Sequence, residues 1–196
     1  MVSTDSRFQH VADGLVLPAF VAGRPVLDFC NTRAGWGEPE PREYLVSYDH
    51  LVIWAREAGL VEPDVAQRLR RLSGGEKTFA RALRLRSAIY AAFTEPSDEA
   101  WDIVAAEAHR AATAARLTRG AGWVIPEDAG AELPVLAIAR AAGELLSSPE
   151  LVKVGRCPGH GCGWLFADPR GRRRWCVMAV CGNREKARRH ARKAHG

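Results

Sequence analysis

The chain contains no long hydrophobic run. No stretch of its 196 residues approaches the ~18 consecutive apolar residues that a membrane-spanning helix needs. The first ten residues also lack the basic-then-apolar pattern of an export signal. We therefore expect a cytoplasmic protein without membrane association, in a compartment where thiols stay reduced.

Signatures of catalysis are missing as well. His10, His50 and His109 are scattered, and no Ser or Cys nucleophile stands at a recognisable spacing from them. The glycine-containing segment 73–77 lacks the spacing of a phosphate-binding loop. Cys30 is isolated, and we expect it to behave as a small buried hydrophobic residue. The sequence therefore predicts a binding protein and not an enzyme.

Cysteine is scarce outside one segment. The other four of the five cysteines are Cys157, Cys162, Cys176 and Cys181. They form two pairs with four residues inside each pair and thirteen residues between the pairs. Structural Zn²⁺ sites commonly take two such pairs as the four corners of a tetrahedron. We predict one structural zinc per chain, with no coordination position left open for catalysis.

Two other interpretations of these cysteines are disulfides and unpaired buried thiols. Disulfides belong to oxidising compartments, and unpaired buried cysteines would not be expected to gather in one short segment. His160 could replace one thiolate, but it lies inside the first pair and we place it outside the ligand set. Between the pairs we expect a hairpin, with one strand at 164–166, a turn at 168–171 and a returning strand at 172–175.

Charge is divided unevenly along the chain. Residues 153–196 contain twelve Lys/Arg and two acidic residues, which gives this segment a net charge of +10. The remaining residues contain sixteen Lys/Arg and twenty-one acidic residues, a net charge of −5. Such a division favours a polyanionic partner for the basic end and not for the rest of the chain.

The basic end reads as a helix from Gly182. Arg184, Arg188 and Arg192 recur every four residues. Ala187, Ala191 and Ala194 form a narrow apolar line, which we expect to pack on the aromatic residues of the predicted zinc-binding segment. Arg and Lys on a rigid helix suit phosphates, and Arg also suits guanine edges. The predicted nucleic-acid contacts are Arg172, Arg173, Arg174, Asn183, Arg184, Lys186, Arg188, Arg189, Arg192 and Lys193.

The rest of the chain has mainly helical periodicity. Helices are predicted at 48–58, 63–72, 98–114 and 135–146, with a longer one from the 73–75 break to Phe93, and a small β-hairpin at 116–118 and 123–125. Trp101, Val104 and Ala108 are expected to face inward. The predicted fold class is therefore mainly α (α+β). It comprises a helical N-terminal domain at 1–150 and a small treble-clef or ribbon-like zinc finger with a basic helix at 151–196.

The C-terminal motif resembles the CGNR zinc finger family. The residues that carry the resemblance are Cys181-Gly182-Asn183-Arg184, the upstream Cys162-Gly163-Trp164-Leu165-Phe166, and Arg173-Arg174-Trp175-Cys176. The resemblance covers about the last forty residues. Members of the family are predicted bacterial transcription regulators and have also been suggested to bind RNA. It implies that the four cysteines bind zinc and that the helix of Asn183 and Arg184 contacts nucleic acid.

The segment 25–32 is similar to the domain usually joined to this finger, the stress-induced transcription regulator (ABATE-type) domain. That domain usually has an aliphatic residue where Cys30 stands. In the same region Asp28 and Asn31 share a helix face, and Arg86 lies on the apolar face of a later helix. Asp28, Asp49 and Asp102 are candidate partners for Arg86. We considered a structural ion pair or a surface-directed side chain for Arg86, and alternatively a small acidic effector bound by Asp28, Asn31 and Arg86.

Three functions fit these observations. We favour a zinc-dependent DNA-binding transcription regulator whose helical domain senses a signal or dimerises. The second is an RNA-binding zinc-ribbon protein in which Trp164, Phe166 and Trp175 stack on bases, provided that they are exposed. The third is a zinc-thiolate redox sensor. One finger covers few base pairs, so we expect a homodimer or a second contact with DNA.

Overall fold

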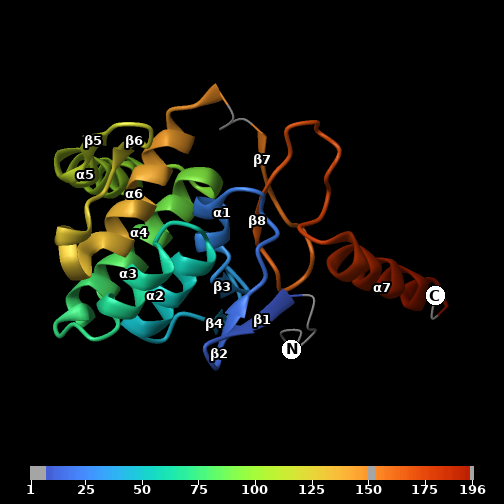
Figure 1. Cartoon of the computed structure of the whole chain (residues 1–196). Helices are drawn as coiled ribbons and strands as arrows, with labels where there is room; N and C mark the ends of the chain where they lie inside the picture. The colour runs from blue at the N-terminus through green and yellow to red at the C-terminus, as the bar shows by residue number, and fades with distance from the viewer. Residues whose placement is uncertain (1–7, 150–152, 195–196) are drawn as a thin grey trace.

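The computed structural model describes residues 8–149 and 153–194, with side chains up to residue 193. Helices form a body on one side of the molecule, the finger lies against it, and the last helix projects away from both (Figure 1). The predicted boundary between residues 150 and 151 lies outside the described residues. Among those residues, no helix combines the length and apolar character needed to cross a membrane.

The predicted class, mainly α with small β elements, is confirmed. The α-helices are α1 (Pro25–Cys30), α2 (Tyr48–Glu57), α3 (Pro63–Leu69), α4 (Gly75–Thr94), α5 (Asp98–Ala114), α6 (Leu133–Leu146) and α7 (Asn183–Ala194). A 3₁₀ segment (Glu127–Glu132) precedes α6, and a π-helical turn (Met178–Gly182) precedes α7. The body helices follow the sequence prediction to within a few residues at each end.

The helix ends follow from local chemistry. The Ser47 and Ser97 hydroxyls accept hydrogen bonds from the backbone N–H groups of His50 and Ala100, and so cap α2 and α5. Proline stands in the first turn of α1, α3 and α6, where its missing N–H costs no hydrogen bond.

The main core gathers around α6. Ten of its fourteen residues are buried, and the helix packs against α5, α4 and α1. Val104 of α5 faces this core as predicted, and Ala108 is half-buried. Trp101 does not, because its side chain is 51% exposed, so the prediction for Trp101 is wrong. The first turn of α5 therefore presents its tryptophan to solvent, while Ala100 beside it and Val104 one turn later are buried.

The strands form separate antiparallel pairs. They are β1 (Gln9–Ala12) with β2 (Leu15–Pro18), β3 (Arg33–Ala34) with β4 (Arg42–Glu43), β5 (Arg116–Thr118) with β6 (Gly122–Val124), and β7 (Val154–Arg156) with β8 (Leu165–Ala167). The predicted hairpin of the body is the β5–β6 pair, in which Leu117 faces Trp123. The β7–β8 pair belongs to the finger, and it builds the first half of the metal site.

Candidate metal centre and nucleic-acid interface

The first cysteine pair lies in the turn between β7 and β8. The Cys157 N–H donates to the carbonyl of Trp164 at 2.8 Å, and the Cys162 N–H donates to the carbonyl of Gly159 at 3.0 Å, so the chain reverses tightly between the two cysteines. Gly159 sits where an added Cβ would lie 3.2 Å from the Cys181 sulfur. A small residue is therefore required here, because the sulfur ligands converge on this turn.

The hairpin predicted between the two cysteine pairs is wrong in its partner strand. Strand β8 pairs with β7, which precedes the first cysteine pair, while 172–175 form no strand. The predicted turn itself is present, since the Gly171 N–H donates to the Asp168 carbonyl and the Asp168 carboxylate accepts from the N–H groups of Arg172 and Arg173. The turn satisfies its own hydrogen bonds, so the chain can leave it without pairing back onto β8.

The second cysteine pair lies at the entrance to α7. Cys176 directly follows residues 172–175. Cys181 lies in the π-helical turn, where its N–H donates to the Val177 carbonyl at 2.9 Å. The wider turn places the Cys181 side chain back toward the first pair while the chain continues directly into α7. The metal ligands and the basic helix are therefore parts of one continuous element.

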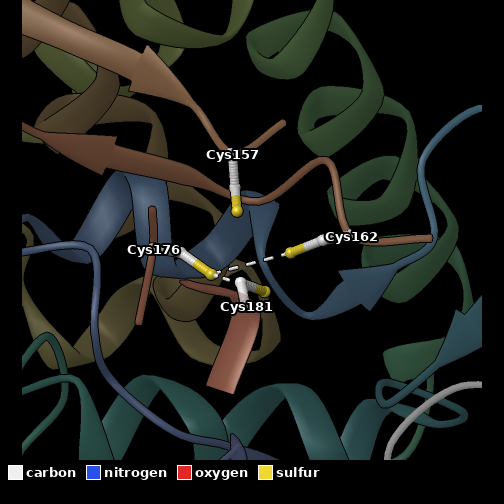
Figure 2. Close-up of side chains that lie close together, drawn as sticks. All are labelled: Cys157, Cys162, Cys176 and Cys181. Atoms are coloured by element: carbon white, nitrogen blue, oxygen red, sulfur yellow. Dashed lines mark hydrogen bonds between the residues drawn. The ribbon is translucent and has the colours of Figure 1, made fainter. Parts of the chain in front are cut away.

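The four sulfurs meet in one place. Their ligand atoms all lie within 4.8 Å of one another, and the sulfurs of Cys162 and Cys181 each lie 3.6 Å from that of Cys176. Figure 2 shows the four side chains converging from two separate segments. Four sulfurs at about 2.3 Å from a zinc ion in a tetrahedron would be about 3.8 Å apart. The set therefore fits one structural zinc, with all four positions filled by protein, as the sequence predicted.

Electrostatics within the set call for a cation. Hydrogen bonding from its neighbours lowers the pKa of the Cys157 thiol, whereas hydrogen bonding to Cys157 raises the pKa of Cys162 and of Cys176. The thiols thus cannot all release their protons together unless positive charge compensates them. Zn²⁺ supplies that compensation and lets all four act as thiolates.

Two residues predicted to contact nucleic acid are turned toward the metal site or its helix. The Arg184 guanidinium donates to the Cys181 sulfur at 3.5 Å and is half-buried. The Asn183 side-chain amide donates to the Ala179 carbonyl and so caps the turn before α7, although the residue is exposed. His160 is exposed and is not part of the sulfur cluster; its backbone N–H donates to Glu185.

The finger is fastened to the body by a buried asparagine. The Asn31 side chain donates to the Leu165 carbonyl at 2.9 Å and accepts from the Leu165 N–H at 2.8 Å. It satisfies both backbone groups of one β8 residue, as a neighbouring strand would. Leu165 itself packs into the core of the body. The finger therefore shares its core and its hydrogen bonds with the body.

Aromatic residues continue this junction. The Tyr90 hydroxyl donates to the Gly163 carbonyl at 2.8 Å, and Trp36 stacks on Tyr90 with ring centroids 3.8 Å apart. Gly163 has φ of +71°, and an added Cβ would lie 3.0 Å from the Cβ of Trp36. Gly163 is therefore needed both for its positive φ and for the close approach of the finger to the body. The Trp164 indole adds a further contact, because it donates to the Arg33 carbonyl.

Two family models match the chain. A family model described as "Putative stress-induced transcription regulator" (ABATE) matches residues 23–149, well over half of the chain. A second model, "CGNR zinc finger", matches residues 153–194. The chain belongs to the ABATE family and carries a CGNR zinc finger. A search of curated proteins finds no match.

Asp28 of the ABATE segment stabilises the junction. Its carboxylate accepts from the N–H groups of Val21 and Ala22 at 2.8 and 2.9 Å, and the carbonyls of the same two residues accept from Arg173 and from the Ala167 N–H of the finger. Burial raises the pKa of Asp28 to about 6, although these hydrogen bonds oppose the shift. Asp28 therefore holds the body segment to which the finger binds.

Arg86 has a structural partner that the sequence did not reveal. Its guanidinium contacts both carboxylate oxygens of Glu43, one at 2.7 Å, and donates to the Thr32 hydroxyl at 2.8 Å. The candidate partners Asp28, Asp49 and Asp102 are therefore wrong. Glu43 was missed because it lies in a loop-like stretch that lacks periodicity, and only the pairing of β3 with β4 brings it to α4.

The three residues predicted around an acidic effector do not form a shared polar cluster. Asp28 binds backbone N–H groups, Asn31 binds Leu165, and Arg86 pairs with Glu43. Of the arrangements considered for Arg86, the structural ion pair is present, with Glu43 as its partner. The effector and the homodimer stay predictions.

The predicted nucleic-acid residues of the CGNR finger divide into two groups. The first group has internal hydrogen-bond partners and consists of Arg173, Asn183, Arg184 and Arg188. Arg173 by itself donates to three carbonyls, those of Ala167, Val21 and Cys176. The other group is exposed and forms no ion pair in the described part of the chain: Arg172, Arg174, Lys186, Arg189, Arg192 and Lys193. The structure thus narrows the set of cations that are available to a partner.

The alanine line of α7 does not pack as predicted. Ala187 and Ala191 are exposed, and the half-buried residues of the helix are Arg184, Glu185 and Arg188. After its first turn the helix leaves the finger and extends into solvent (Figure 1). The aromatic residues that the alanines were expected to cover are buried by the body instead, because Trp164 and Phe166 are only 1% and 2% exposed.

Proposed function

We propose that the protein is a zinc-dependent DNA-binding transcription regulator and not an enzyme. The observation that carries this proposal is the exposed cationic surface of α7, defined here as Lys186, Arg189, Arg192 and Lys193, on a helix that begins two residues after the metal ligand Cys181. Arg172 and Arg174 of the preceding turn add two exposed cations. A projecting basic helix with a fixed origin suits a DNA groove and its flanking phosphates.

Zinc gives this surface its orientation. Residues 176–194 contain few buried apolar side chains, so the path from Cys176 into α7 depends on the metal and on contacts with the body. Because Asn31 and Arg173 hold the finger on the body, the orientation of α7 is also defined relative to the whole molecule. The body could then transmit a signal to the helix through this junction. We place the protein in the cytoplasm, where the thiols remain available to the metal.

The RNA-binding alternative has less support. Stacking on unpaired bases needs exposed aromatic faces, and Trp164 and Phe166 are buried. Trp175 is half-buried, and the Arg174 guanidinium lies over its ring. The redox alternative is also weakened, because exposure favours thiol oxidation and the four cysteines are at most 6% exposed.

The test is a selection of bound sequences from random duplex DNA, with single-stranded RNA selected in parallel. Zinc-loaded, full-length protein is used, and binding of the enriched sequences is measured from 50 to 200 mM salt. Six phosphate contacts would lower the affinity by about 10³-fold across this range. Enrichment from RNA alone would support the RNA alternative, and binding that stays constant across the salt series would contradict phosphate contact altogether.

A further inference from the structure

An acidic loop of the body faces the basic helix across a groove. The cavity between them has a volume of about 530 Å³. One wall comes from the loop before β4 and the other from the cysteine turn and α7. The lining residues are Glu38, Pro39, Glu40, His160, Gly161, Arg184 and Arg188. Two carboxylates of the acidic body are thus placed beside the finger's helix.

The two carboxylates are not neutralised by the arginines opposite them. Glu38 and Glu40 are exposed, and within the described residues neither forms an ion pair. Arg184 donates to the Cys181 sulfur, and Arg188 donates to Glu185 at 3.0 Å. The two arginines of α7 that line the groove are therefore already engaged, and they face two free negative charges.

The opposite edge of α7 has the reverse character. At 100° per residue, Lys186, Arg189 and Lys193 lie on the side of the helix away from Arg184 and Arg188. All three are exposed, and none forms an ion pair in the part of the chain that is described. The helix thus presents one edge of free cations and, beside the carboxylates, one edge of paired cations, with the exposed Arg192 between the two edges.

Distance makes this difference matter for a polyanion. A cavity of this volume is about 10 Å across, close to the Debye length of ~8 Å at physiological ionic strength. A phosphate that entered the groove would lie within about one Debye length of both carboxylates, so their repulsion would be only partly screened. A phosphate on the opposite edge would be separated from them by the helix itself.

We propose that Glu38 and Glu40 form an acidic lip that excludes nucleic-acid phosphates from the groove face of α7. Double-stranded DNA is thereby confined to the edge of Lys186, Arg189 and Lys193, which sets how the duplex is oriented on the molecule. The lip also lowers affinity for any sequence, so it favours sites that offer base contacts as well. This inference rests on the proposed function.

The test compares two double variants of the zinc-loaded, full-length protein. Glu38→Gln/Glu40→Gln removes the lip, and Glu99→Gln/Asp102→Asn removes two exposed carboxylates from α5, on the far side of the body (Figure 1). Binding to a random-sequence duplex is measured at 50 and 150 mM salt. We expect the lip variant to bind about 2- to 5-fold more tightly at 150 mM, with a larger gain at 50 mM, because screening weakens as salt is lowered. By the same screening argument, the control variant should change the affinity by less than about 1.5-fold.

A second comparison tests the edge directly. Arg188→Ala and Arg189→Ala remove the same charge from adjacent positions of α7, about 100° apart around the helix, one on the groove edge and one on the edge of free cations. Arg189→Ala should weaken binding about 3- to 10-fold, as expected for one lost phosphate contact, and Arg188→Ala should weaken it less. An equal or larger loss for Arg188→Ala would place phosphates in the groove and overturn the proposal.

Other results of the lip experiment are equally decisive. If the lip variant behaves like the α5 variant, the carboxylates do not act on the bound DNA and the inference fails. If the lip variant binds its selected sequence more weakly, Glu38 or Glu40 accepts a hydrogen bond from a base amine, and the lip is a reader and not a barrier. Wild-type protein that binds no nucleic acid would refute the proposed function itself, which is a separate result.

Discussion

The body and the finger are stabilised in different ways. The body buries the apolar faces of the five helices α1 to α5 around α6, and its core residues come from all six helices. The finger has a small cluster in which the four cysteines lie beside Trp164 and Phe166, together with Phe8, Ala34 and Tyr44 of the body. A helical domain can fold on its hydrophobic core alone, whereas this finger needs a metal and a partner surface.

The difference assigns separate roles to the two regions. The finger uses only some of its charged residues for its own contacts, among them Arg173, Arg184 and Arg188. In α7 four cations remain exposed and without ion pairs in the described residues, while in the body Arg56, Arg70, Arg81 and Arg110 are engaged by carboxylates. The comparison predicts that the regions respond differently to the same kinds of damage.

Loss of the metal should have the largest effect, and only on the finger. Cys176→Ser, or a strong chelator, removes a contribution on the order of 10 kcal/mol to the finger's folding. We expect loss of bound zinc, a fall in DNA affinity of more than about 100-fold and reduced helicity from α7, with the body still folded. Metal analysis and circular dichroism measure this, and Cys30→Ser is the matched control because Cys30 lies outside the cluster. A fully unfolded Cys176→Ser protein would contradict the independence of the body.

Loss of the Arg86–Glu43 ion pair should destabilise the body. The Arg86 side chain is buried and the Glu43 side chain is 34% exposed, so Arg86→Ala should lower the free energy of unfolding by about 1–3 kcal/mol, between the values for exposed and for fully buried pairs. Urea denaturation measures the effect. Arg86→Met keeps most of the buried side-chain volume. It should lose less free energy of unfolding when it is combined with Glu43→Gln than when it is made alone, because the double variant leaves no unpaired charge. An unchanged urea midpoint for Arg86→Ala would show that the pair contributes nothing to the body.

Loss of the asparagine at the junction should affect both regions. Asn31→Ala leaves the buried N–H and C=O of Leu165 without partners, at a cost of about 3 kcal/mol in unfolding free energy. We also expect faster zinc release, since β8 leads directly from the cysteine turn. Gln67→Ala, which removes an exposed side-chain amide from α3, is the control and should change stability by less than about 0.5 kcal/mol. Normal zinc retention in Asn31→Ala would separate the metal site from the junction.

The smallest expected effect is a pH dependence at the same junction. The pKa of Asp28 is about 6 in the folded protein, above its ordinary value of 3.8, so the folded state holds this proton more tightly than the unfolded state does. Asp28 therefore favours folding most at low pH, and that contribution falls as pH rises toward 6. Between about pH 5 and pH 7 the loss is about 1 kcal/mol. Asp28→Asn keeps an oxygen for both N–H groups, and stability curves of the two proteins should diverge by this amount across that range. Parallel curves would show that Asp28 does not titrate there.

Several body elements were predictable from local patterns. The hydroxyls of Ser47 and Ser97 and the prolines of three first turns mark helix ends through short-range hydrogen bonding and fixed φ, which a sequence displays directly. The cysteine spacing likewise contains the metal site, because ligand type and separation are enough to define a tetrahedral thiolate set. The exposure of Trp101 was not predictable in this way, since helical periodicity does not say how far a neighbouring helix extends.

What the sequence by itself determined is the set of helices, the zinc ligands and the concentration of positive charge after residue 153, because each depends on neighbours within a few positions along the chain. Tertiary structure alone decided that β8 pairs with β7, that Glu43 meets Arg86, and that Asn31 binds Leu165 across 134 positions. It also decided which arginines are used inside the protein and which remain for a partner. These contacts depend on where distant segments meet, and a hydrogen bond or an ion pair leaves no periodic trace in the sequence of either segment.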